Sequence, residues 1–161
     1  MRVEPTTWDD PDVQRLAIDQ QVELRARYDG DGEPGTPPSA ADISAVVVAR
    51  SDDGTAVGCG ALRELDEGTA ELKRMYVAPA HRGAGVASTI LAALEDVARN
   101  RGWWTLRLET GPRQPEAVAL YLRAGYRPID AFGGYRDAAD AADSLFFERV
   151  LEPVGIRPAA G

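Results

Sequence analysis

The spacing of hydrophobic residues along the chain predicts a mixture of strands and helices. Short runs that are continuously apolar, or that alternate between apolar and polar residues, are typical of strands when turn residues bound them. Apolar residues that recur every three or four positions, after a proline or glycine near the start, are typical of helices. By these criteria we predict strands at residues 2–5, 43–50, 56–64, 69–77, 104–110, 126–129 and 144–151, and helices at 11–27, 86–101 and 115–122.

The order of these elements predicts an α+β fold with a mixed, mostly antiparallel sheet. Tight turns at 51–54 and 66–68 join three successive strands, which indicates an antiparallel meander. The helix at 86–101 then separates two strands by the length of a crossover connection. We therefore expect the strands at 69–77 and 104–110 to pair in parallel.

Two segments have a composition that is unfavourable for regular structure. Residues 29–42 are rich in glycine, proline and acidic side chains, and we expect a flexible loop there, either a solvated linker or a mobile lid beside a substrate site. We expect residues 153–161 to form a disordered tail. With 161 residues the chain has the length for one core of ordinary size, so we predict a single domain at 1–152.

Composition places the chain among soluble globular proteins. Hydrophobic residues make up 44% and charged residues 27%, close to the averages for that class. The sequence shows no apolar run of bilayer length and no apolar signal core in its first residues, so we expect a cytoplasmic protein with no membrane partner. Cys59 is the single cysteine, which leaves no internal disulfide, and we expect it to fill a small buried gap. Frequent alanine and arginine, with Lys73 as the single lysine, suggest a bacterial source.

The net charge argues against one large class of partners. At −8, with a pI near 4.7, the chain lacks the basic surface that nucleic-acid binding requires. We therefore predict no nucleic-acid partner, and any site for a phosphate group must be local.

The stretch Arg82-Gly83-Ala84-Gly85-Val86-Ala87 is the strongest candidate for such a local site. Its two glycines leave backbone amides uncovered by side chains, and the helix that starts here directs the positive end of its dipole at the loop. The arginine at its start can bond phosphate oxygens with both arms of its guanidinium group. The alternative is a glycine-rich turn that binds nothing.

Two familiar phosphate loops fit this stretch poorly. A nucleotide P-loop needs lysine and then Ser or Thr after its last glycine, where this chain has Val86 and Ala87. A dinucleotide-binding turn has a third glycine where Ser88 stands, and it should follow its strand directly, whereas five residues separate Val77 from Gly83.

The spacing within this stretch, together with a second segment, resembles one known family. Arg82, Gly85 and Ala87 satisfy a pattern of Arg or Gln, two free positions, Gly, one free position, and Gly or Ala. In the GNAT family, the GCN5-related N-acetyltransferases, this pattern marks the acetyl-CoA loop. The second segment resembles the family's tyrosine helix and comprises Ala117, Tyr121, Gly125 and Tyr126.

The resemblance covers the chain from Val46 to Val150. It implies a GNAT-type sheet of six to seven strands with helices on both faces and a splay between strands four and five. It also implies acetyl-CoA as co-substrate: backbone amides of the glycine loop would bind the pyrophosphate, and the pantothenate arm would enter the splay. Gln114 stands where many members carry asparagine. The cofactor-binding residues predicted in this way are Met75, Tyr76, Val77, Arg82, Gly83, Ala84, Gly85, Val86, Ala87, Ser88, Gln114 and Tyr121, and no metal is expected.

Acetyl transfer to an amine needs a base for the ammonium proton and an acid for the departing thiolate. Glu71 is the first candidate for the base, because it lies where related histone acetyltransferases carry theirs; the alternative is an ion pair with an arginine on the neighbouring strand. Glu109 is the second candidate base. By the family pattern Tyr121 is the acid, with the alternative that it only packs in the core.

These features predict an N-acetyltransferase that moves the acetyl group of acetyl-CoA directly to a primary amine of a small molecule, amino acid or peptide. The alternative from another class is a non-catalytic module that binds and senses acetyl-CoA. The expected partners are a small-molecule or peptide amine, and the expected assembly is a monomer or homodimer.

Overall fold

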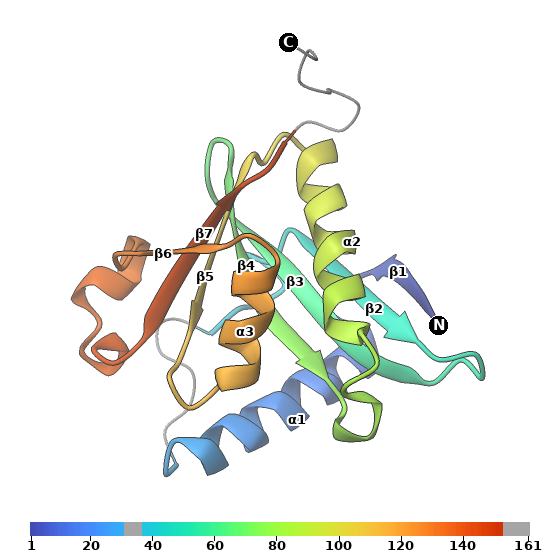
Figure 1. The fold of residues 1–161 in the computed structure, drawn as a ribbon. Helices are drawn as coiled ribbons and strands as arrows, with labels where there is room; N and C mark the ends of the chain where they lie inside the picture. The colour runs from blue at the N-terminus through green and yellow to red at the C-terminus, as the bar shows by residue number, and fades with distance from the viewer. Residues whose placement is uncertain (31–36, 153–161) are drawn as a thin grey trace.

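The computed structural model describes residues 1–30 and 37–152, which form a seven-stranded sheet and three α-helices (Figure 1). All the predicted strands and helices are present, with ends that differ from the prediction by at most two residues. Residues 31–36 of the predicted loop and the predicted tail, 153–161, lie outside the described residues. The strands are β1 (Arg2–Thr6), β2 (Ala45–Arg50), β3 (Ala56–Asp66), β4 (Thr69–Val77), β5 (Thr105–Thr110), β6 (Arg127–Ile129) and β7 (Leu145–Val150); the helices are α1 (Pro11–Arg27), α2 (Val86–Asn100) and α3 (Pro115–Arg123).

The strand order is β1-β2-β3-β4-β5-β7-β6, and β4 with β5 is the one parallel pair among the described strands. This pairing is short, because it ends where Glu71 faces Arg107. Beyond that point the two strands diverge (Figure 1). The predicted fold class, with its splay between the fourth and fifth strands, is confirmed.

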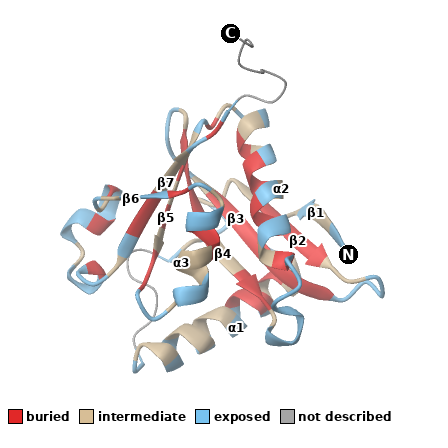
Figure 2. Cartoon of the chain, viewed as in Figure 1, coloured by how far each residue is buried: buried red, intermediate tan, exposed pale blue. Residues whose placement is uncertain are grey.

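Helices cover both faces of the sheet, which explains why β2 is apolar at successive positions. Val47 and Ala49 belong to the core with α2 and α3, whereas Val46 and Val48 pack with α1 on the opposite face. Figure 2 shows the resulting layer of buried residues between the helices and the strands. The segment between β6 and β7 forms 3-10 turns at Gly133–Asp137 and Ala139–Ala141, which the sequence pattern does not predict.

Two glycines let α2 approach the sheet closely. A Cβ built at Gly58 would lie 2.8 Å from the side chain of Ile90, and one at Gly60 would lie 2.7 Å from that of Leu94. Side chains at these positions of β3 would therefore push the helix outward. This close packing fixes the start of α2, and with it the glycine loop, against the end of β4.

A bulge distorts β4 just beyond the last residue that pairs with β5. Arg74 has a φ of 56°, and the partner of β3 residue Cys59 is Tyr76 whereas the partner of Ala61 is Lys73. Three residues of β4 thus span the distance of two residues of β3, which is what a bulge does. The bulge bends β4 and redirects its following side chains at the place where the sheet opens.

Candidate active site

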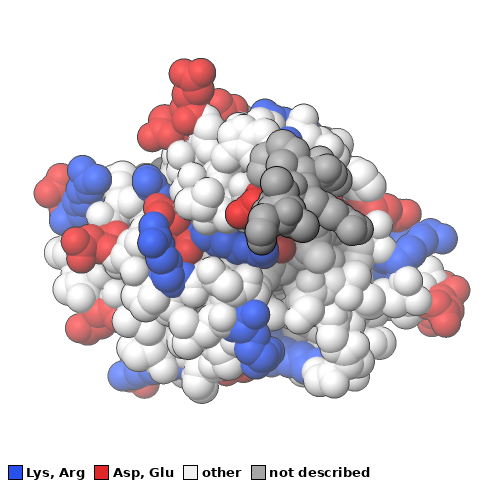
Figure 3. Space-filling view, turned by 45° about the horizontal axis from the view of Figure 1, so that its top comes forward, with Lys and Arg blue, Asp and Glu red and all other residues white. Residues whose placement is uncertain are grey.

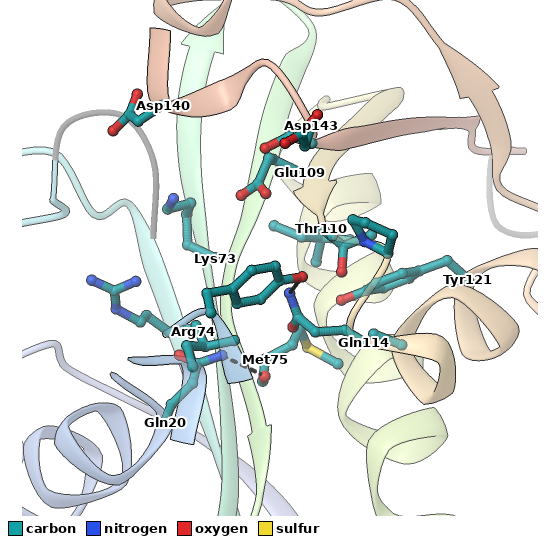
Figure 4. A pocket seen from close by; sticks show the side chains of 17 residues that line it. Gln20, Lys73, Arg74, Met75, Glu109, Thr110, Gln114, Tyr121, Asp140 and Asp143 are labelled. Carbon is teal, nitrogen blue, oxygen red and sulfur yellow. Dashed lines mark hydrogen bonds between the residues drawn. The ribbon is translucent and has the colours of Figure 1, made fainter. Parts of the chain in front are cut away.

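The opening between β4 and β5 contains a pocket of about 190 Å³. Five parts of the chain line it: the second half of α1, the bulge of β4, the end of β5 with the loop that follows, α3, and the segment 140–144. Figure 4 shows a division within it. Lys73, Glu109, Asp140 and Asp143 lie toward one end, and Met75, Gln114 and Tyr121 lie toward the other, with Arg74 beside Gln20.

Tyr121 enters the pocket from α3, on the face of the sheet that α2 also covers. Its side chain is buried, and its ring packs edge-on against Tyr126 with the centroids 5.6 Å apart. Burial, and then the negative charge of Glu109, raises the pKa of Tyr121 well above its ordinary value. The phenol therefore stays protonated at neutral pH, a state that suits a proton donor.

Glu109 reaches the same pocket from β5, two residues past the last residue paired with β4. Its neighbours Leu106 and Leu108 pack with α2, so by strand alternation Glu109 points to the other face. Burial raises the pKa of Glu109 from 4.5 to about 7, although the nearby Lys73 ammonium and a hydrogen bond from Ser144 oppose the rise. Both protonation states are accessible near neutral pH, as a general base requires.

Glu71, the first candidate base, does not line this pocket. It is 1% exposed, and its carboxylate accepts a hydrogen bond from Arg63 Nη2 at 3.1 Å and from the Tyr135 hydroxyl at 2.6 Å. Arg63 lies on β3, so the ion pair with a neighbouring strand that the sequence left open is present. The structure brings Glu109 and Tyr121 together and places Glu71 behind them.

The glycine loop has the backbone that an anion site requires. Gly83 and Gly85 adopt φ values of 83° and 81°, in the left-handed region that favours glycine, and Gly85 is the N-cap of α2. Thr89 N makes a hydrogen bond to Gly85 O at 3.1 Å. Because the first amides of a helix have no partner within it, the N–H groups of Val86 to Ser88 point out of the helix end. Gly83, Ala84 and Gly85 are exposed beside them.

Arg82 ties the start of this loop to two other elements. Its Nε donates to Val77 O at 2.8 Å, and its two terminal nitrogens bond the carboxylate of Glu23 on α1 at 2.9 and 3.1 Å. The guanidinium group also lies over the Tyr76 ring, 5.4 Å from its centroid. The side chain thus anchors the loop to β4 and α1, and its contact with a phosphate stays a prediction.

A second hollow, of about 120 Å³, lies between the end of β4, α1 and α3. It brings together predicted cofactor residues that are far apart in the sequence, because Met75, Tyr76, Val77, Arg82 and Gln114 all line it. Met75 and Gln114 also line the larger pocket. The two hollows are therefore adjacent, and together they extend from the glycine loop to Tyr121.

The sequence pattern missed what α1 contributes to the pocket. Tyr28, at the C-cap of α1, crosses to the loop after β5, where its hydroxyl accepts from Arg113 N at 3.2 Å and from Gln114 Nε2 at 3.4 Å. A Cβ at Gly111 would lie 1.9 Å from that hydroxyl, so only glycine fits beneath it. Gln20, also on α1, donates from Nε2 to Met75 O at 2.8 Å. No local pattern indicates that α1 would dock here.

Lys73, Asp140 and Asp143 are further pocket residues that sequence reasoning did not assign to the site. Lys73 offered one signal, which is that the single lysine of the chain lies within a predicted strand. The two aspartates lie in the segment between β6 and β7, whose 3-10 turns bring them to the pocket.

The outer surface shows no segregation of charge in the view of Figure 3, where acidic and basic side chains are interspersed. No helix within residues 1–30 and 37–152 is long and apolar enough to cross a membrane. The groups with distinctive chemistry are those of the pocket and of the glycine loop.

Comparison with known proteins identifies the family of this chain. The model of the acetyltransferase (GNAT) family matches residues 11–126. An IAA acetyltransferase of Azospirillum brasilense is 37% identical over 143 residues, which cover 84% of this chain and 91% of that protein. A solved structure from Klebsiella pneumoniae, assigned as an acyl-CoA N-acyltransferase, has a TM-score of 0.79 at 36% identity and covers 94% of this chain and 97% of that one.

A GNAT family acetyltransferase of Elizabethkingia anophelis, solved with acetyl-CoA bound, has a TM-score of 0.69 over 93% of this chain and 97% of that one. At 20% identity this likeness shows the shared fold. The family model and the Azospirillum relative both reach most of the chain and include the glycine loop. This chain therefore belongs to the GNAT family of acetyltransferases, which confirms the resemblance carried by its loop and its tyrosine helix.

Proposed function

We propose that this acetyltransferase moves the acetyl group of acetyl-CoA directly to a primary amine of a small molecule, an amino acid or a peptide. The observation that carries the proposal is the shared pocket, which Tyr121 and Glu109 enter from opposite faces of the sheet. One of these groups holds its proton at neutral pH, and the other can take one up.

The donor end of the site fits the chemistry of acetyl-CoA. Its pyrophosphate needs hydrogen-bond donors and a positive potential, and the exposed amides of the loop and the N-terminus of α2 offer both. The hollow beside Met75 and Gln114 would hold the narrow arm between the pyrophosphate and the thioester. The bound donor supplies the activated acetyl group, and the protein supplies its alignment.

Two side chains of the pocket would handle the protons of the reaction. Glu109 takes a proton from the acceptor ammonium, which frees the nitrogen lone pair to form the N–C bond. Tyr121 gives its proton to the sulfur as the C–S bond breaks, and the second proton that the nitrogen loses once the N–C bond has formed returns Tyr121 to its neutral form. Because the two groups lie on opposite sides of the opening, the amine can approach from the α1 face while the thiol leaves toward α3.

The position of each carboxylate favours Glu109 over Glu71 as the base. Glu109 lies beyond the end of the parallel pairing and lines the pocket, whereas Glu71 still lies within that pairing and is covered by Arg63 and Tyr135. A base must come within hydrogen-bond reach of the proton that it removes. Glu71 faces a different hollow, which Arg63, Phe132 and Tyr135 also line, and so lies outside the pocket that Tyr121 enters.

Release of free thiol from acetyl-CoA, measured with a panel of primary amines, tests the proposed function. We expect release with at least one amine and a product that mass spectrometry finds heavier by one acetyl group. Binding of acetyl-CoA without release, seen as a raised Tm, would instead support the alternative function of a sensor of acetyl-CoA. A protein that neither binds nor turns over acetyl-CoA would contradict both functions.

A further inference from the structure

The contacts behind the pocket form a directed chain of hydrogen bonds. The Tyr135 hydroxyl gives its one proton to Glu71 at 2.6 Å, so its oxygen is left to accept, and it accepts from Lys73 Nζ at 3.2 Å. Lys73 Nζ also lies 3.8 Å from Glu71 Oε2. Glu71, which Arg63 bonds as well, receives a hydrogen-bond donor on each of its oxygens.

This chain of contacts holds the Lys73 ammonium in a place where burial alone would disfavour its charge. Lys73 is 3% exposed, and burial lowers the pKa of its ammonium while the negative charge of Glu71 opposes that change. A buried cation is tolerated when an anion and hydrogen bonds compensate it. The ion pair with Glu71 therefore holds the ammonium group of Lys73 at a fixed place on β4.

The Lys73 side chain shares the pocket with the candidate base. Lys73 and Glu109 line the same end of it, from the neighbouring strands β4 and β5, and Figure 4 shows both side chains there. Other groups that act on Glu109 are Ser144, which donates a hydrogen bond, and the acidic Glu71 and Asp140. The neutral Tyr121 and Tyr135 also lie within its field. Arg74 and Asp143 line the same pocket, so Lys73 acts on Glu109 beside a second cation and several carboxylates.

We propose that Lys73, held in place by Glu71 and Tyr135, is a positioning residue that keeps Glu109 ionised and directed at the acceptor amine. The proposal rests on the proposed function, in which Glu109 is the base. It gives Glu71 a part in the reaction without any contact with substrate. It also accounts for the single lysine of the chain lying inside a buried strand, where its desolvation is costly.

The variant Lys73→Met removes the charge and keeps a side chain of similar length, while Glu71 keeps Arg63 and Tyr135. Without the ammonium Glu109 holds its proton more tightly, so the acidic limb of the kcat/KM profile should move to higher pH by about one to two units. Lys73→Arg restores a charge and should reverse most of that shift. Arg127→Met is the matched control: it removes a cation that is 73% exposed on β6, and it should leave the limb in place.

Carbon-13 NMR of the glutamate carboxyl groups, with the Glu109 signal assigned through Glu109→Gln, measures the same shift without turnover. A Glu109 midpoint that moves upward in Lys73→Met supports the proposal. An unchanged midpoint overturns it, whether or not the protein acetylates an amine. A shifted midpoint in a protein that acetylates no amine would overturn the role in the reaction through the proposed function, so the two failures are distinguishable.

A second variant keeps the test decisive if Lys73→Met does not fold. Lys73→Met/Glu71→Gln removes both charges of the buried pair and leaves no carboxylate without its cation. Because Lys73 lines the pocket with Glu109 whereas Glu71 does not, loss of the cation should outweigh loss of the carboxylate, and the Glu109 midpoint of this variant should still lie above the wild-type value. A midpoint at or below the wild-type value would overturn the proposal.

Discussion

The glycine loop, which is the proposed donor end of the site, and the pocket between β4 and β5, which is its proposed acceptor end, are built from different kinds of group. The donor end consists of backbone amides that belong to neighbouring residues, 82–88, and most of these residues are exposed. The acceptor end is lined by side chains that come from as far apart as Gln20 and Ser144, and three of its titratable groups, Lys73, Glu109 and Tyr121, are largely withdrawn from water. Recognition by main chain depends on local backbone conformation, whereas the chemistry of buried side chains depends on how distant segments pack.

The charged groups of the two ends also differ in their exposure to water. At the donor end Arg82 meets the carboxylate of Glu23 at 2.9 Å near the surface. At the acceptor end burial dominates, and it raises the pKa of Glu109 to about 7 despite the nearby Lys73. Changes at the donor end should therefore act on the binding of acetyl-CoA, and changes at the acceptor end should act on the rate and on its pH dependence.

The largest expected effect comes from Gly85→Glu, which tests the donor end. The new side chain would strain a φ of 81° and would place a negative charge at the anion site, so we expect acetyl-CoA binding to be abolished in calorimetry. Gly54→Glu is the matched control, because Gly54 has a φ of 88° in the turn between β2 and β3 and shares the strain without the site. Retained binding in Gly85→Glu would contradict the pyrophosphate cradle.

The next effect tests the acceptor end. Tyr121→Phe removes the proposed proton donor and keeps the ring, so kcat should fall about 10²-fold while the Kd for acetyl-CoA changes little. Tyr126→Phe is the control for losing a buried phenol: it removes a 3.0 Å hydrogen bond to Glu95 and should lower the Tm with little change in kcat. An unaffected kcat in Tyr121→Phe would leave this residue with a packing role alone.

This contrast explains how much of the molecule could be predicted from the sequence. Strands and helices follow from local spacing, and so does the glycine loop, since one short stretch holds the glycines, the arginine and the helix start that it needs. The splay between β4 and β5 was predicted from the resemblance to the GNAT family and not from local spacing. Its extent depends on where the parallel pairing ends, which is at Glu71 and Arg107.

That end point decides which carboxylate reaches the pocket, and no local pattern reveals it. Glu71 and Glu109 both lie on strands beside the splay, but Glu71 still lies within the parallel pairing and Glu109 lies past its end.

The contribution of α1 to the pocket could not be predicted either, because it also depends on how distant segments pack. The Tyr28 hydroxyl forms hydrogen bonds with Arg113 and Gln114, which are far from it in the sequence. Gly111 leaves the space for this hydroxyl, but nothing in the sequence around Gly111 indicates such a contact.

A smaller effect, on the free energy of unfolding, tests whether the buried carboxylate of Glu109 destabilises the folded protein. Glu109 has a folded-state pKa of about 7 against an ordinary 4.5, so between these values the folded chain holds a proton that the unfolded chain has released. Stability is therefore lost as the pH rises through this window. Glu109→Gln should be about 1–2 kcal/mol more stable than wild type at pH 8, which is less than the full shift implies because solvent screens part of the carboxylate.

Urea unfolding of both proteins at pH 5 and pH 8 checks this expectation, because the gain should shrink toward pH 5. Asp53→Asn should change the free energy of unfolding in the opposite direction. A hydrogen bond from Ser51 lowers the pKa of Asp53 to about 2, so loss of this carboxylate should destabilise the protein at neutral pH. A gain in Glu109→Gln that is equal at both pH values would mean that ionisation of Glu109 is not its source.

The smallest effect concerns Gln114, which lines both the pocket and the hollow beside it, and where the resemblance to the family leads us to expect asparagine. Its side chain makes one long hydrogen bond, to Tyr28 at 3.4 Å, and does not cap α3. Gln114→Asn should lose that bond and raise the KM for acetyl-CoA by roughly two- to threefold, because such a bond contributes about 0.5 kcal/mol. Asparagine is a good N-cap, so the Tm should hold or rise slightly. A tenfold rise in KM would instead mean that the side chain binds the donor directly, and would make recognition at the donor end depend on a side chain as well as on backbone amides.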